Sequence, residues 1–155
     1  MTNINFILPE IFISLSIMVL LVVGVFKKNS TSLIYSLSVV TLIVTIGLII
    51  NYLSHQETFL FNDSYKIDQL STFMKIVTIL SGVFVLISSY NYIKLENIFK
   101  IEYPILILCS ILGMMVMISS YDLIVFYIGL ELQSLSLYVL AAFNRDKIES
   151  SESGL

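Results

Sequence analysis

Five long apolar stretches limit what this chain can fold into more than any other feature. A helix that crosses a bilayer needs about 20 mostly apolar residues to cover about 30 Å of hydrocarbon. The stretches lie at approximately residues 6–26, 33–53, 70–93, 104–120 and 122–143. With 57% hydrophobic and only 12% charged residues, the chain has too little polar surface for a water-soluble globule. The sequence therefore predicts an all-α polytopic membrane protein with five transmembrane helices.

The connections between the stretches differ in length and charge. Residues 54–68 are long enough for a small hairpin or an interfacial loop, whereas only the segment SSYD, residues 119–122, separates the last two stretches. The fourth and fifth helices should therefore form a tight antiparallel pair. Basic residues gather after the odd-numbered stretches, at Lys27, Lys28, Lys94, Lys100, Arg145 and Lys147. The positive-inside rule then places the N-terminus outside or in the intermembrane space, and the C-terminus in the cytoplasm or matrix.

Composition also argues against several classes of function. A net charge of −3 with scattered basic residues gives no electrostatic footprint for nucleic acid. One cysteine, Cys109, and one histidine, His55, offer neither an internal disulfide nor a metal site, and Cys109 is expected to be a small buried apolar residue. The N-terminus lacks the basic residues of a signal or transit peptide. The chain is rich in Ile, Asn, Lys, Phe and Tyr, which are encoded by AT-rich codons. This composition favours an origin in an organelle genome or in an AT-rich bacterium.

Glu131 is the charge that the sequence places deepest in the membrane. It lies nine residues after Asp122, or roughly 13 Å along a helix, and a charge at the membrane centre normally marks a functional site. The residues that share or border its helix face are Tyr127, Gln133, Ser134, Leu135, Ser136 and Tyr138. This arrangement predicts a proton-relay acid supported by hydroxyl groups. The alternative is a buried, protonated Glu that only holds helices together by hydrogen bonding.

Two further charges lie near the ends of predicted spans. Glu10 follows Pro9 in the first turn of the first helix, where the helix dipole favours an acid close to the interface. Lys75 lies little more than one turn into the third helix, and its long stem could extend to the outer interface. We therefore expect structural positions for both, with a buried role of Lys75 in an ion path as the alternative.

The segment GLELQSLSLYVLAAFNRD, residues 129–146, carries a family likeness. It resembles the fifth-helix signature of the antiporter-like subunits of proton-pumping NADH:quinone oxidoreductase, respiratory complex I. The run LQSLSLYVLAAF, followed after one Asn by an Arg, looks most like the member called subunit 2, or subunit N in bacteria. The motif LPEI, residues 8–11, is similar to that family's opening helix.

The resemblance implies a larger antiporter-like fold built from two inverted five-helix repeats, of which this chain forms part. Residues 1–103 would hold helices one to three, and residues 104–155 would hold helices four and five, the start of the first repeat. In that family the fifth-helix Glu pairs with a Lys on the seventh helix, and only Glu131 has a counterpart here. We therefore expect a second chain to supply helices six onward and the Lys partner. The alternative is a truncated sequence.

The function that the resemblance implies is a membrane-arm contribution to proton translocation coupled to quinone reduction. The chain itself would bind no cofactor, because NADH, FMN, iron–sulfur clusters and ubiquinone belong to the assembled complex. Its partners would be other membrane-arm subunits and membrane lipids, in the mitochondrial inner membrane or, alternatively, the bacterial plasma membrane. Two other functions stay open: a structural scaffold that carries no protons, and a subunit of a related cation/proton antiporter or photosynthetic dehydrogenase.

Overall fold

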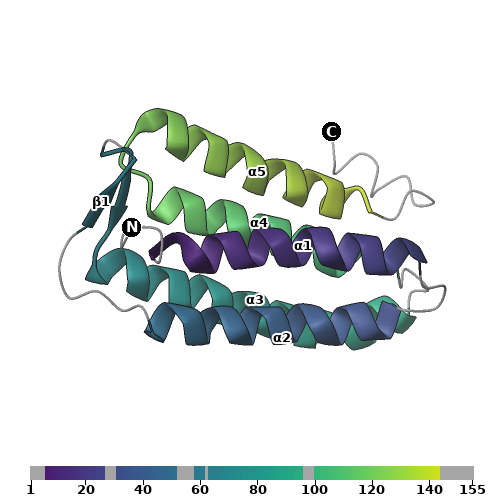
Figure 1. Cartoon of the computed structure of the whole chain (residues 1–155). Helices are drawn as coiled ribbons and strands as arrows, with labels where there is room; N and C mark the ends of the chain where they lie inside the picture. The colour runs from purple at the N-terminus through teal and green to yellow at the C-terminus, as the bar shows by residue number, and fades with distance from the viewer. Residues whose placement is uncertain (1–5, 27–30, 52–57, 62, 96–99, 144–155) are drawn as a thin grey trace.

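Five helices lie side by side, with a short β-hairpin at one end of the bundle (Figure 1). The computed structural model describes residues 6–26, 31–51, 58–61, 63–95 and 100–143. The elements in chain order are α1 (Leu8–Phe26), α2 (Thr31–Asn51), β1 (Thr58–Leu60), β2 (Tyr65–Ile67), α3 (Gln69–Leu95), α4 (Glu102–Ile118) and α5 (Leu123–Ala141). The prediction of five apolar helices is confirmed. Of the two forms that the sequence allows for residues 54–68, the structure has the hairpin.

Four of the helices, α1, α2, α3 and α5, are long and apolar enough to cross a membrane. Helix α4 is also apolar but has 17 residues, or about 26 Å at 1.5 Å per residue, slightly less than the hydrocarbon thickness. It begins at Glu102, two residues before the predicted start at Pro104. The proline still lies in the first turn, where its missing N–H leaves no helical hydrogen bond unmade.

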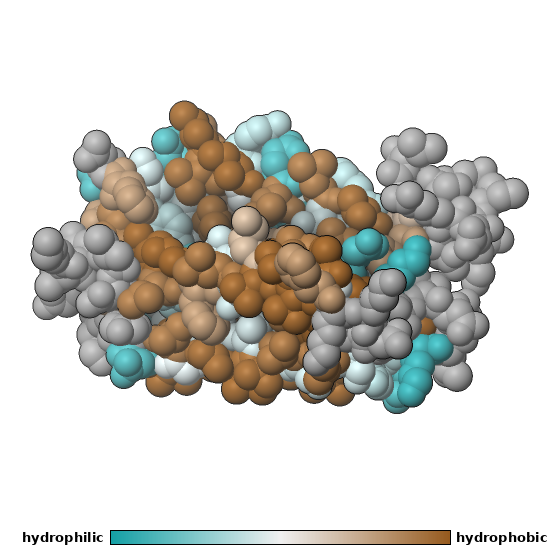
Figure 2. All heavy atoms as spheres, turned by 45° about the vertical axis from the view of Figure 1, so that its right-hand side comes forward, coloured by the Kyte–Doolittle hydropathy of each residue, from teal (hydrophilic) through white to brown (hydrophobic). Residues whose placement is uncertain are grey.

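Apolar side chains cover both the inside and the outside of the bundle. Ile13, Leu42, Leu86, Leu108 and Met115 are among the buried residues that form the core between α1, α2, α3 and α4. On the face drawn in Figure 2, hydrophobic residues also dominate the outer surface of the described helices. Because large side chains are exposed along every long helix, the outer surface is suited to lipid rather than water.

Helices α4 and α5 approach each other closely through two glycines. A Cβ atom added to Gly113 would lie 2.8 Å from the carbonyl oxygen of Gly129, and one added to Gly129 would lie 2.9 Å from that of Gly113. Small residues allow this backbone contact in membrane helix pairs. The predicted tight pair is therefore confirmed. Only Gly129 and Ser136 of α5 are buried, so most of the remaining α5 surface is open.

The hairpin ties the start of α3 to the α4–α5 connection. The Lys66 N–H donates to the Ser119 carbonyl at 2.8 Å, and the Tyr121 N–H donates to the Ser64 carbonyl at 3.0 Å. Asp68 caps α3, because its carboxylate accepts from the Ser71 N–H at 2.7 Å while its own N–H donates to the Ser71 hydroxyl at 2.9 Å. This reciprocal pair of bonds follows the logic of a capping box and fixes the hairpin against the bundle.

Candidate functional sites: a mid-helix carboxyl and a buried ion pair

Glu131 lies near the middle of the 19-residue helix α5, as its distance from Asp122 predicts. Its side chain is half-buried. The buried face of α5, marked by Gly129 and Ser136, packs against α4. No ion pair joins Glu131 to a Lys or Arg among the described residues. The structure thus places this carboxyl between the α4 contact and the open surface of α5.

The predicted supporting residues of Glu131 differ in where they lie. The Tyr127 hydroxyl, one turn earlier, interacts with the Glu131 carboxylate, whereas the Ser134 hydroxyl donates to the Glu131 backbone carbonyl at 3.2 Å. Tyr138 is 58% exposed, and the Gln133 backbone lies against Gly113. Of the four predicted residues, Tyr127 is therefore the one close enough to interact electrostatically with the carboxylate.

Glu10 and Lys75 form a buried ion pair, which the sequence did not predict. The Lys75 Nζ lies 2.6 Å from the Glu10 Oε1, and the two side chains are only 5% and 6% exposed. Glu10 does lie in the first turn of α1, as expected. The prediction that Lys75 extends to the outer interface is wrong, because its ammonium group points inward and pairs with the Glu10 carboxylate of α1. The two helices, α1 and α3, begin 61 residues apart along the chain (69 − 8).

Tyr65 of β2 is the third member of this cluster, and sequence analysis missed it. Its hydroxyl donates to Glu10 Oε1 at 2.8 Å and lies 3.3 Å from Lys75 Nζ. Burial, and next the charge of Glu10, raises the pKa of the Tyr65 hydroxyl far above its usual range, so Tyr65 acts as a neutral donor. The sequence signal was weak, since a tyrosine in a polar connection is ordinary.

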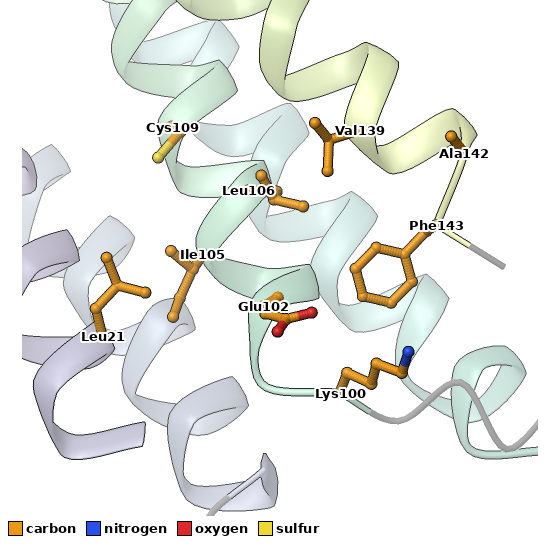
Figure 3. Close-up of a pocket in the computed structure, with 9 residues that line it drawn as sticks. All are labelled: Leu21, Lys100, Glu102, Ile105, Leu106, Cys109, Val139, Ala142 and Phe143. Carbon is orange, nitrogen blue, oxygen red and sulfur yellow. The ribbon is translucent and has the colours of Figure 1, made fainter. Parts of the chain in front are cut away.

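A cleft at the other end of the bundle is separate from both charged sites (Figure 3). It has a volume of about 620 Å³ and contains none of the predicted site residues. Its walls come from α1, α4 and the end of α5, and they include Leu21, Ile105, Cys109 and Phe143. Cys109, expected to be buried, is only half-buried here. Among the described residues, no group of three or more His, Cys, Asp or Glu side chains could hold a metal ion.

The fold and these sites define a class: a multi-pass membrane protein with ionisable groups inside an apolar helix bundle. Residues 120–155 match the family described as NADH:quinone oxidoreductase/Mrp antiporter, TM. That match contains Glu131 and begins at the α4–α5 connection.

Similarity to particular proteins extends over the whole chain. It is 66% identical over 155 residues to NADH-quinone oxidoreductase subunit N of Pelagibacter ubique (strain HTCC1062), covering 100% of this chain and 33% of the relative. The subunit N of Maricaulis maris (strain MCS10) is 40% identical over 154 residues, covering 99% and 32%. The chain thus resembles the N-terminal part of subunit N, as the sequence predicts, and spans about a third of the length of these relatives.

A solved structure shows the same fold. A chain of respiratory complex I from Thermus thermophilus with bound Aureothin matches with a TM-score of 0.78 at 16% identity, covering 94% of this chain and 31% of that chain. The chain therefore shares its fold with a chain of that complex over most of its length.

Proposed function

We propose that this chain is part of a subunit N of proton-translocating NADH:quinone oxidoreductase and contributes to proton translocation coupled to quinone reduction. The observation that carries the proposal is the 66% identity to a subunit N over all 155 residues. The half-buried carboxyl in the middle of α5 supports it, because ionisable groups at that depth mark ion and proton pathways in membrane proteins.

Glu131 acts as a proton-binding acid whose charge depends on a neighbouring cation. A carboxyl in an apolar setting favours its neutral form, and an approaching cation favours its charged form. The Tyr127 hydroxyl lies close enough to the carboxylate to interact with it electrostatically. The cation comes from a segment that covers the open side of α5, supplied by a second chain or by a continuation of the fold. Residues 104–155 begin the first repeat, and residues 1–103 form the preceding unit.

The other parts of the reaction belong to the assembled complex. Other membrane-arm subunits pack against the apolar outer surface, while NADH, FMN, iron–sulfur clusters and ubiquinone are bound elsewhere. The relatives described above come from bacteria, which favours the bacterial plasma membrane over the mitochondrial inner membrane. The distribution of basic residues favours an outside position for the hairpin end, since Lys94 and Lys100 lie at the opposite end of α3 and α4.

The test is Glu131→Gln in the assembled complex, reconstituted into vesicles. We expect normal assembly on native gels and a reduced proton uptake per NADH oxidised, because Gln keeps the size of the side chain but cannot bind a proton. The matched control is Glu102→Gln, which removes an exposed acid from the first turn of α4.

Two outcomes would count against the proposal. If proton uptake and quinone reduction both remain normal in the Glu131→Gln complex, Glu131 carries no protons. If assembly is lost while the control assembles, the scaffold function is favoured instead.

A further inference from the structure

We propose that Glu10, Lys75 and Tyr65 form a second proton-binding site, independent of Glu131, with one water molecule bound beside Lys75. The inference rests on the proposed function, because it adds a site to the same proton translocation. The three residues come from three elements, α1, β2 and α3, and meet at a single carboxylate oxygen, Glu10 Oε1.

The two oxygens of the Glu10 carboxylate are in different situations. Oε1 accepts hydrogen bonds from both Lys75 and Tyr65, whereas Oε2 is buried and has no hydrogen-bond partner in the described structure. A buried polar atom without a partner is rare in native proteins and calls for a water, an ion or a functional explanation. Because Oε1 already has two donors, Oε2 is the atom that takes the proton.

The Lys75 ammonium group, beside Glu10, has one N–H donor more than its two hydrogen bonds use. An ammonium group carries three N–H donors, and the structure assigns two of them, to Glu10 Oε1 and to the Tyr65 hydroxyl. A small cavity of about 20 Å³ is lined by Lys75, by Thr72, and by Pro9, the residue before Glu10. That volume is enough for one water molecule, which would accept from Lys75 and contact the Thr72 hydroxyl.

The chemical step is a simple proton exchange. A hydronium ion loses one O–H bond and becomes water, while a new O–H bond forms at Glu10 Oε2. The pair then changes from no net charge to one positive charge on Lys75. Since an uncompensated buried charge is unfavourable, the site binds its proton only weakly and releases it again. Tyr65 and Lys75 are the titratable groups that contact Glu10 among the described residues.

The first test uses the double variant Glu10→Gln/Lys75→Met in the reconstituted complex. Removing both charges together leaves no unpaired buried ion, and such replacements are often tolerated. We expect normal assembly with a partial loss of protons moved per electron. The matched control is Lys66→Met/Asp68→Asn, which removes the partly exposed ion pair of the same hairpin, where Nζ and Oδ2 lie 3.6 Å apart. An unchanged ratio of protons to electrons in the assembled double variant would overturn the proposal.

A second measurement does not depend on pumping or on the double variant. Tyr65→Phe keeps both charges and removes one hydrogen bond to Glu10. Infrared difference spectra of the complex at two pH values should contain a protonated-carboxyl band whose frequency changes in Tyr65→Phe but not in Glu131→Gln. The absence of any Tyr65-sensitive carboxyl band would overturn the second site even if pumping is altered. Normal pumping in Glu131→Gln, in contrast, would count only against the function proposed for Glu131.

Discussion

The two acids Glu10 and Glu131 lie in opposite environments within the same bundle. Glu10 is almost fully buried and its cation, Lys75, is in the same chain. Glu131 is half-buried on a helix that packs chiefly against α4, with no cation of the described residues in contact. Glu10 has its counter-charge within the described part of the fold, whereas Glu131 has none there. The two acids therefore differ in pairing: Glu10 belongs to a buried ion pair between two helices, and Glu131 lies on a helix that the described residues leave largely open.

Lys75→Met alone should have the largest effect on stability. It leaves the Glu10 carboxylate buried without its cation, and breaking a buried ion pair on one side costs about 3–5 kcal/mol. Thermal inactivation of the purified complex should occur at a clearly lower temperature, with recovery in the Glu10→Gln/Lys75→Met double variant. If the single variant is as stable as the wild type, the pair does not stabilise the bundle.

Tyr65→Phe should have the next largest effect. Its hydroxyl donates to a charged oxygen that also binds Lys75, and a hydrogen bond to a charged group contributes about 1.5–3 kcal/mol. The same thermal inactivation measurement should place it between Lys75→Met and the wild type. Tyr127→Phe is the matched control beside the open acid, since Tyr127 is 61% exposed, and its stability should stay close to that of the wild type.

Asp68→Ala should cost about 1 kcal/mol, the usual effect of removing a helix cap, and its effect should depend on pH. The Ser71 backbone N–H lowers the pKa of the Asp68 carboxyl below its ordinary value. The carboxylate therefore contributes its full stability above the unfolded-state value of about 3.9, and loses it as the pH falls through the lower folded-state value. Thermal melting in detergent at neutral pH should separate the variant from the wild type, and the difference should vanish at strongly acidic pH. A difference that persists in acid would contradict this assignment.

The sequence predicted the helices well because apolar length alone decides them. It also predicted the α4–α5 pair, since four residues between two spans leave no other arrangement. The mid-helix position of Glu131 followed from counting residues along one helix. The Glu10–Lys75 pair could not be predicted in this way, because its members are 65 residues apart. The pair forms because the hairpin folds over the ends of α1 and α3. From the sequence, Glu10 and Lys75 are seen to lie near helix ends, but not whether another segment covers those ends.

Glu131→Gln should have the smallest effect on stability and the clearest effect on function. Among the described residues, the Glu131 carboxylate has no buried cation to leave behind. Its replacement should therefore change the unfolding free energy by no more than about 0.5 kcal/mol, as for substitutions away from buried networks. Thermal inactivation should match that of the wild type while proton uptake per electron falls. Lys75→Met should lose both stability and pumping. If Glu131→Gln instead destabilises the complex as strongly as Lys75→Met, then Glu131 is already held by a buried cation in the assembly, and its role is closer to that of Glu10 than the open face of α5 indicates.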